Sequence, residues 1–401
     1  MTRTALGLAA ALRAGELSAA EVARDHLERL DVLRPVIGAV AATEPERTLA
    51  AAAESDRRLR AGAARPLEGV PFTIKDWIDV EGWRVLGATT APLADPGRRP
   101  AADATAVARL RAGGAVPLAI SCALAETAAH GRTRNPRDPS RAPGGSSSGA
   151  AALVAAGASP LALGSDSGGS IRLPAAWCGA AGLKPTFGRV PLTGHFPRCG
   201  SLEDGRTVIG PLATSVDDLA AALPLIAGPD GLDAGVAPVP LGDPDAVDMS
   251  SLRVGVMGGG PAGGAARALA GAGATVVETP MPDVHDEALD ITLRHWGRAR
   301  LTGEENVRLL WDWDRFRRRL LLLTAEIDVL VSPATDGPPP PWREWEVGDY
   351  RWTLPWSLTG APAVVVPVSE EAGLPVAVQV IGRPWQDHVA LAAARCVESA
   401  S

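Results

Sequence analysis

Hydrophobic positions along the chain follow a helical period in some stretches and form short apolar runs, typical of buried strands, in others. The N-terminal part has the helical period, and it predicts three amphipathic helices over 4–14, 18–33 and 44–62. A capping box of Ser18 and Glu21 opens the second helix, and Pro35 predicts its end. We expect these helices to form a layer packed outside a sheet.

Beyond this layer, apolar runs of strand length alternate with helical stretches. The first run, 70–74, ends at Lys75 and Asp76. Further strands are predicted over 115–120, 160–164, 252–257, 274–278, 328–332, 361–368 and 374–382. Helices are predicted over 104–114, 149–157, 216–228, 265–273, 283–299, 304–326 and from about residue 386. This alternation predicts a layered α/β fold with a mixed β-sheet.

Two stretches interrupt the alternation. Residues 131–143 are polar and broken by prolines, which predicts an irregular loop. Residues 228–250 are rich in proline, glycine and aspartate, which predicts a linker or a long surface loop. No repeat of roughly 20–50 residues is visible, so the chain does not have the pattern of a repeat protein.

Composition narrows the class of protein. The chain has 401 residues, 46% of them apolar and 21% charged, and its net charge of −7 comes from interleaved charges, so we expect no nucleic-acid partner. No apolar run reaches the roughly 18 residues of a membrane span and no secretory signal pattern is present, so we expect a cytoplasmic protein without a membrane partner. The cysteines lack CxxC spacing and are expected to be reduced: Cys122, Cys178, Cys199 and Cys396.

Two loops rich in glycine and serine stand out, PGGSSSG at 143–149 and GSDSGGSIRLP at 164–174. Pro174 is expected to end an extended exit from the second loop. The first loop could be a flexible linker, although it runs directly into a helical stretch. Its GxSxG spacing also fits a nucleophile elbow with Ser147 as nucleophile, but that motif needs a preceding strand, which the prolines of 134–143 disfavour. The second loop has the outer spacing of a phosphate-binding loop, yet Ser170 stands where lysine is required, so phosphate binding is disfavoured.

Lysine is scarce, because only Lys75 and Lys184 among the 39 basic residues are lysines. Cleavage of an amide requires an activated nucleophile, a base, an acid for the leaving amine and donors for the oxyanion. A buried, neutral lysine can be the base, whereas arginine cannot lose its proton in a protein. Lys75 is therefore the candidate base, with a surface lysine at a strand end as the alternative. No histidine is near either loop in sequence, although five could approach in space: His130, His195, His285, His295 and His388.

Four segments resemble the amidase signature family, in order and over most of the chain: EGVPFTIKD, APGGSSSGAAA, GSDSGGSIRLPAAWCGAAGLKPTFGRVP and LPVAVQVIG. The resemblance implies a single α/β domain whose central mixed β-sheet is covered by helices on both faces. It also implies a Ser-Ser-Lys triad, in which Ser170 is the nucleophile, Ser146 relays protons and Lys75 is the base. The interval of 24 positions between the two serines agrees with the family. In the family the relaying serine follows a cis peptide bond, here Gly145–Ser146.

The second loop gains a further role from this resemblance. Its glycines carry no side chains, so the backbone N–H groups of four consecutive residues can converge on one oxygen as an oxyanion hole. These residues are Ser167, Gly168, Gly169 and Ser170. No cofactor and no metal ligands are implied.

The resemblance also assigns supporting residues. Asp166 and Arg172 are expected to brace the second loop, Ser147 to support the triad by hydrogen bonding, and Thr127 to line the substrate pocket. The chain departs from the family at AISC, residues 119–122, and at Ser357, where an asparagine is common. It is also shorter than most members, chiefly between residues 230 and 330. These regions shape substrate pockets, so the resemblance says least about the substrate.

The C-terminal part has an unusual composition. Seven of the 11 tryptophans lie between Trp296 and Trp356, and they either pack the core and surface or line an apolar or aromatic acyl pocket. The arginines at 315, 317, 318 and 319 fit a solvated helix face better than a carboxylate clamp.

These observations predict one domain over 1–401, with a helical layer at 1–65, a catalytic core at 66–215 and a variable, substrate-shaping part at 251–401. We expect a cofactor-independent amidase acting on a small-molecule amide. One alternative is the glutaminase (A-type) subunit of a tRNA-dependent amidotransferase, which would need partner subunits. The other is a catalytically silent scaffold of the same fold. A homodimer is compatible with the sequence.

Overall fold

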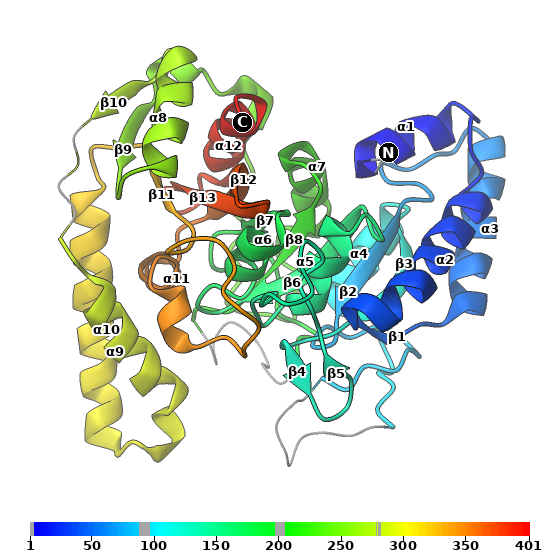
Figure 1. The fold of residues 1–401 in the computed structure, drawn as a ribbon, viewed down its shortest axis with the longest axis horizontal. Coiled ribbons are helices and arrows are strands. Elements are labelled where there is room, and N and C mark those ends of the chain that lie inside the picture. Colours follow the sequence, from blue (N-terminus) through cyan, green and yellow to red (C-terminus); the bar gives the residue numbers. More distant parts are fainter. Residues whose placement is uncertain (1–3, 88–96, 197–204, 278, 280–281) are drawn as a thin grey trace.

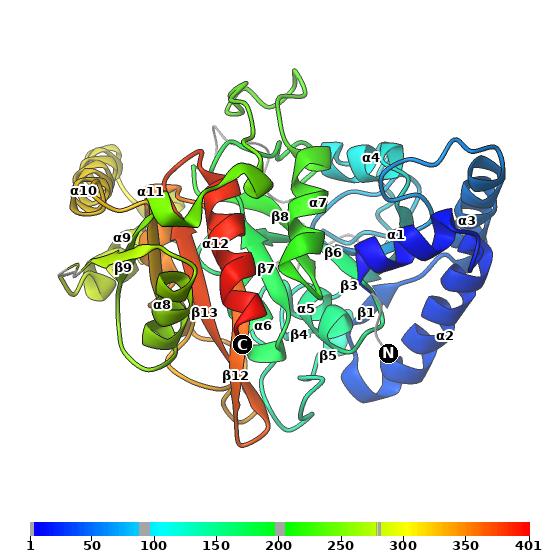
Figure 2. The ribbon, with the colours of Figure 1, turned by 90° about the horizontal axis from the view of Figure 1, so that it is seen from above.

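The structure is a computed structural model, and it describes residues 4–87, 97–196, 205–277, 279 and 282–401. These residues build one large sheet with helices on both of its faces (Figures 1 and 2). No helix in these ranges is long and apolar enough to cross a membrane.

Eleven strands form the sheet in the order β1-β3-β2-β6-β8-β7-β12-β13-β11-β9-β10. Their bounds are β1 Val40–Ala42, β2 Pro71–Lys75, β3 Val116–Ser121, β6 Leu161–Asp166, β7 Ala181–Lys184, β8 Val208–Ala213, β9 Arg253–Val256, β10 Thr275–Val277, β11 Val329–Pro333, β12 Ala363–Glu371 and β13 Leu374–Gly382. Strand β2 is parallel to β3 and β6, and β9 is parallel to β10 and β11, while the other pairs are antiparallel. The predicted mixed sheet is confirmed. A separate hairpin pairs β4 (Glu126–Thr127) with β5 (Gly131–Arg132).

The helices pack around this sheet. They are α1 Ala5–Arg13, α2 Ala19–Ile37, α3 Pro45–Arg60, α4 Thr105–Ala112, α5 Ser148–Ala155, α6 Arg172–Cys178, α7 Val216–Ile226, α8 Pro261–Gly271, α9 His285–Trp296, α10 Gly303–Leu323, α11 Leu354–Thr359 and α12 Asp387–Ser399. Helices α1 to α3 form the expected layer at one end of the molecule, and α9 and α10 lie at the opposite end (Figure 1).

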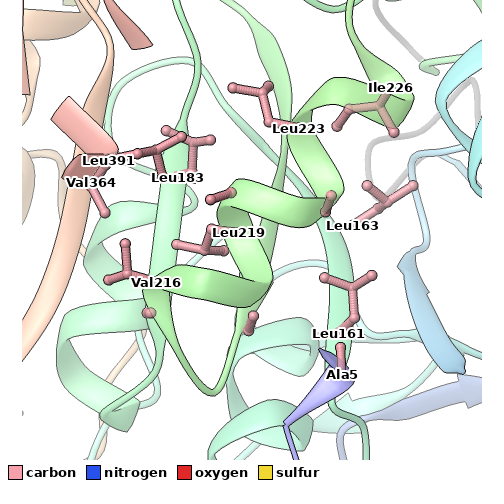
Figure 3. Packing of buried hydrophobic residues seen from close by; sticks show 14 of the residues in the cluster. Ala5, Leu161, Leu163, Leu183, Val216, Leu219, Leu223, Ile226, Val364 and Leu391 are labelled. Atoms are coloured by element: carbon pink, nitrogen blue, oxygen red, sulfur yellow. The ribbon is translucent and has the colours of Figure 1, made fainter. Parts of the chain in front are cut away.

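Alternation of side chains along the strands divides the core into two layers. On β6, Leu161 and Leu163 point toward α7, where they pack in one cluster with Leu219 (Figure 3). Ala162, between them, belongs to a second cluster that includes Leu153 of α5. Each leucine buried in this way contributes about 1.5–3 kcal/mol to stability. The sheet is thus held from both faces, which fixes the strand ends that carry the site.

Two prolines were interpreted wrongly from the sequence. Pro35 does not end its helix, because α2 continues to Ile37 and is capped by Gly38 in a left-handed conformation. The missing N–H of Pro35 leaves the Asp31 carbonyl without its helical partner, but Asp31 is exposed to water. Pro174 was expected in an extended exit from the second loop, yet it lies in the first turn of α6, where a proline needs no hydrogen-bond acceptor.

Strands β1, β7 and β8 and helices α6 and α11 were not predicted, and β5 lies in the stretch expected to be an irregular loop. Other segments follow the sequence more closely. Residues 228–250 form a loop with two single-turn helices, Pro244–Ala246 and Met249–Ser251. The predicted strand at 274–278 is β10, and its last predicted residue lies outside the described ranges. Cys122, Cys178 and Cys396 are free thiols, and Cys199 is not among the described residues.

Candidate active site

Lys75 is the last residue of β2, which lies between β3 and β6 in the sheet. Its side chain is fully buried, so the alternative of a surface lysine is wrong. The ammonium nitrogen Nζ donates to Ser146 Oγ at 2.7 Å and to Ser165 Oγ at 3.0 Å. Burial lowers the pKa of Lys75 well below its ordinary value, and the nearby Asp166 carboxylate opposes this shift. The environment of Lys75 therefore favours loss of the proton from its side chain.

The first loop enters the core immediately before α5. The peptide bond Gly145–Ser146 is cis, as the family resemblance implied. Ser146 is 3% exposed, and its hydroxyl contacts the lysine. Ser147 ties this loop to the second one, since its N–H donates to the Ser170 carbonyl at 3.0 Å and its hydroxyl donates to the Ser165 carbonyl at 3.2 Å. Ser147 is thus fully engaged in joining the two loops.

The second loop leaves the end of β6 and turns into α6. Asp166 and Arg172, both fully buried, bracket it and form a salt bridge with two contacts of 3.0 Å. The Asp166 carboxylate also accepts the N–H of Ile171 at 3.1 Å. Burial favours the neutral acid, but the charge and hydrogen bonds of Arg172 outweigh it and lower the pKa of Asp166. The salt bridge between Asp166 and Arg172 joins the two ends of the loop, which fits the bracing role expected for both residues.

Ser170 is half-buried at the start of α6. Its hydroxyl lies 3.3 Å from the phenol oxygen of Tyr350, which itself donates to the Gly145 carbonyl at 2.6 Å. Within the described residues, the hydroxyl of Ser170 is bonded to Tyr350 rather than to Ser146. The structure therefore brings Lys75 and Ser146 into direct contact, and it joins Ser170 to them through backbone and tyrosine.

The glycines of the second loop lie where side chains would not fit. Gly169 has φ of +150°, and a Cβ there would come within 2.2 Å of Thr353 Oγ1. Thr353 donates to the Gly168 carbonyl at 2.6 Å, which turns that carbonyl toward α11. In the described part of the chain, the backbone N–H groups of residues 167–170 donate to no protein acceptor. These donors are available to a ligand oxygen.

Thr127 lies apart from the triad. It is in the short strand β4, and its hydroxyl accepts the N–H of His130 at 3.0 Å. His130 in turn contacts Asp76 at 2.9 Å, next to Lys75. Hydrogen bonds thus link Thr127 through His130 to Asp76, the residue that follows Lys75. Lining of the pocket by Thr127 stays a prediction. The hydroxyl of Ser167 bonds to that of Thr207.

Aromatic residues from the variable part cover both loops. Trp345 approaches Gly145 so closely that a Cβ there would come within 2.3 Å of its ring. The ring centroid of Trp345 lies 4.9 Å from that of Tyr350 and 6.4 Å from that of Trp296. A Cβ at Gly168 would meet Trp296 at 3.4 Å. Two of the seven tryptophans are therefore at the site, whereas Trp311 is 59% exposed on α10.

Sequence reasoning missed Ser165, Tyr350 and Thr353, and it noted Ser357 without giving it a role in the site. Tyr350 is the single tyrosine of the chain, a compositional signal comparable to the scarcity of lysine. Thr353 carried no signal. Ser357, noted as a departure from the family, accepts Arg172 Nη2 at 2.6 Å and so helps to hold the brace. In the described ranges, no group of three or more His, Cys, Asp or Glu side chains could hold a metal ion.

The second lysine is also buried. Lys184 ends β7, and its Nζ donates to the Pro185 carbonyl at 2.9 Å. Burial and the neighbouring charge of Arg172 lower its pKa to about 7, and Asp166 and Asp387 oppose the shift. Lys184 is therefore close to the charges of Asp166 and Arg172, and its hydrogen bond goes to Pro185 rather than to a serine of the two loops.

Two serine loops, the second of them braced by a buried ion pair, meet around a buried lysine, an arrangement that can support hydrolysis through a serine. The sequence model of the amidase family matches residues 21–302 and 304–391. This chain therefore belongs to the amidase signature family. It is an enzyme that hydrolyses amide bonds.

Two curated relatives span nearly the whole chain. AtzE, a 1-carboxybiuret hydrolase subunit from Pseudomonas sp. (strain ADP), is 34% identical over 96% of this chain and 96% of its own length. The A-type subunit of the glutamyl-tRNA(Gln) amidotransferase of Chloroflexus aggregans is also 34% identical, over 95% of this chain and 93% of its own. That alignment spans 464 positions, more than the 401 residues present here, so this chain lacks segments that the relative has.

Solved structures agree with this assignment. A chain from a vestigial protein complex, linked to the evolutionary origins of an s-triazine catabolic enzyme, superposes with a TM-score of 0.88, 30% identity and coverage of 99% of this chain and 98% of that one. A peptide amidase in complex with the inhibitor chymostatin gives a TM-score of 0.81, 28% identity and coverage of 99% and 97%. The fold is thus that of the amidase signature enzymes.

Proposed function

We propose that the chain hydrolyses a carboxamide to a carboxylic acid and ammonia or an amine, through an acyl-enzyme on Ser170. The observation that carries this proposal is the 2.7 Å contact between Lys75 Nζ and Ser146 Oγ, both buried. Burial lowers the pKa of Lys75, which favours the neutral amine that a base requires. Arginine at this position could not do the same.

The first half-reaction begins when the Ser170 hydroxyl turns toward Ser146. Its proton passes to Ser146 while the Ser146 proton passes to neutral Lys75, and Ser170 Oγ forms a bond with the amide carbon. The oxyanion that develops is stabilised by the backbone N–H groups of residues 167–170, which are unpaired in the described structure. The same path then returns a proton to the amide nitrogen, the C–N bond breaks and the amine leaves.

Water completes the cycle. It attacks the ester carbon of the acyl-enzyme, gives its proton to Lys75 through Ser146, and the Ser170 oxygen leaves and regains a proton. The acid is then released. An ester substrate needs less protonation of its leaving group, so we expect an esterase side activity.

The acyl group of the substrate is proposed to be apolar or aromatic. Trp296, Trp345 and Tyr350 lie against the glycine loops that hold Ser146 and Ser170. Aromatic side chains offer large apolar surfaces with few polar groups to satisfy. Such a wall favours a flat or hydrophobic acyl group over a small polar one.

A second candidate is the glutaminase subunit of a tRNA-dependent amidotransferase, favoured by the 34% identity to one such protein. This function predicts release of ammonia from free glutamine and co-purification of partner subunits. Failure to release ammonia from glutamine, combined with hydrolysis of aryl amides, excludes it.

One experiment tests the main proposal. The purified chain is treated with a fluorophosphonate probe, and a library of amides is screened for release of acid. We expect labelling at Ser170 and hydrolysis, both lost in Ser170→Ala. Unlabelled Ser170 with no hydrolysis would leave a catalytically silent scaffold, and activity retained in Ser170→Ala would refute the mechanism.

A further inference from the structure

The outer face of α10 carries hydrophobic side chains that the fold leaves uncovered. Leu309, Phe316 and Leu320 are buried on the inner face of this helix. Opposite them, Trp311 is 59% exposed and Leu322 is 75% exposed. With 3.6 residues per turn, positions three, four and seven away from Trp311 share its face. The helix lies at the edge of the molecule in both ribbon views (Figures 1 and 2).

Four of the five charged residues at these positions lie symmetrically in sequence about Trp311, and the fifth is Arg315. Glu304 lies seven positions before Trp311 and Arg318 seven after it. Arg308 lies three positions before and Asp314 three after. In each case the two members have opposite charges. In the described structure no hydrogen bond or ion pair joins these four side chains to a residue outside α10, and Arg318 pairs along the helix with Asp314 at 2.8 Å.

This symmetry matches a two-fold axis through Trp311. An antiparallel copy of the helix would place Glu304 of one chain opposite Arg318 of the other, and Arg308 opposite Asp314. Because a two-fold interface repeats every contact, four complementary pairs would form around one pair of tryptophans. Val307, which is 55% exposed, would meet the aliphatic stem of Arg315, four positions beyond the axis.

We propose that α10 is a homodimerisation surface, on which two copies of the chain pair antiparallel about Trp311. The proposal concerns assembly and does not rest on the proposed reaction. The alternating signs favour a second copy over an anionic membrane, because Glu304 and Asp314 on the same face would be repelled by acidic lipids. Tryptophan and arginine are also the residues enriched at the energetic centres of protein interfaces.

The expected dimer is modest in affinity. The helix has 21 residues, so it is about 30 Å long, and a single helix pair buries less than the roughly 1,600 Å² of a standard interface. We therefore expect a dimer that dissociates on dilution. Sedimentation equilibrium of the full chain over about 1–100 μM should show a shift from monomer to dimer.

Substitutions test whether the dimer forms through the outer face of α10 or through another surface. Trp311→Glu should give a monomer over the whole range, because it places two carboxylates at the axis. The matched control is Val32→Glu, at a 70% exposed position on α2, which should leave the dimer intact. Circular dichroism and fluorophosphonate labelling report whether each variant is folded.

A charge-exchange experiment tests the antiparallel register directly. Glu304→Arg and Arg318→Glu should each raise the dimer dissociation constant about tenfold or more, since each reversal acts twice. The double variant restores opposite charges across the axis and should return the constant to within about threefold of the wild type. A parental chain that stays monomeric, a dimer insensitive to Trp311→Glu, or a double variant without recovery would each overturn the proposal. So would a monomer that binds vesicles of phosphatidylglycerol through this face.

Discussion

The Ser170 hydroxyl lies 3.3 Å from the phenol oxygen of Tyr350, and that phenol donates its single proton to the Gly145 carbonyl. Because the phenol proton is already used, the Ser170 hydroxyl must be the donor in this contact. Burial raises the pKa of Tyr350 well above its ordinary value, so the phenol stays protonated. The tyrosine thus joins Ser170 to the residue that precedes Ser146.

Replacing Tyr350 with phenylalanine tests this link. The change leaves the buried Gly145 carbonyl without its donor and loosens Ser146 relative to Ser170. We expect kcat/KM to fall about tenfold, the size of one neutral buried hydrogen bond. The pH profile should keep its shape, because the phenol does not titrate in the working range. An unchanged or higher kcat/KM would show that the tyrosine only occupies space.

Lys75→Arg should be nearly as damaging as Lys75→Ala. Arginine keeps the positive charge but cannot be deprotonated, so both variants lose the base. We expect kcat to fall about 1,000-fold in each, within the range of general-base catalysis. Steady-state rates on the best amide of the library measure this. If the arginine variant kept most of the wild-type rate, the neutral-lysine mechanism would be wrong.

The pH dependence of kcat/KM should have an acid limb. In the proposed mechanism Lys75 acts as the neutral amine, so we expect the rate to be lost as the pH falls through its pKa and to rise as the proton leaves. Burial places this midpoint well below the ordinary lysine value near 10.4. Lys184 also titrates low, so Lys184→Met is the control and should retain the limb. A profile that is flat on the acid side would contradict the assignment of the base.

Lys184 should make stability depend on pH. Its pKa in the folded chain is about 7, whereas an unfolded lysine titrates near 10.4. Between these values the unfolded chain binds more protons, so the free energy of unfolding rises with pH by at most about 1.4 kcal/mol per unit. Lys184→Met should reduce the slope, because only the contribution of Lys75, whose pKa is also lowered, remains, and urea unfolding at pH 7 and pH 9.5 measures the difference. Equal slopes in the two proteins would count against a neutral Lys184.

The aromatic side chains against the glycine loops, Trp296, Trp345 and Tyr350, predict which substrates are preferred. We expect aryl or long-chain amides to be hydrolysed faster than acetamide, because only they contact Trp296 and Trp345. Trp345→Ala should lower kcat/KM for the aryl amide about tenfold or more and that for acetamide much less, since the half-buried tryptophan ring offers its large apolar surface only to a substrate big enough to reach it. A preference of the wild type for acetamide would show that Trp296 and Trp345 do not line the acyl site.

Local pattern predicted most of the fold. The apolar runs located eight strands of the large sheet, including β2 with Lys75 at its end, but not β1, β7 or β8, and the capping box located the start of α2. The errors at Pro35 and Pro174 have one cause. Whether a proline breaks a helix depends on its place within the first or last turn, and local pattern does not set the helix ends that precisely.

The sequence by itself determined the family, the α/β class and the candidate chemistry of Lys75, Ser146 and Ser170, because these are written in contiguous motifs and in the scarcity of lysine. Only the tertiary structure decided that Lys75 is buried and meets Ser146, that Tyr350 reaches Ser170, and that Trp345 covers Gly145. These contacts join residues far apart along the chain. Burial and pKa arise from the packing of the whole sheet, which no local pattern records.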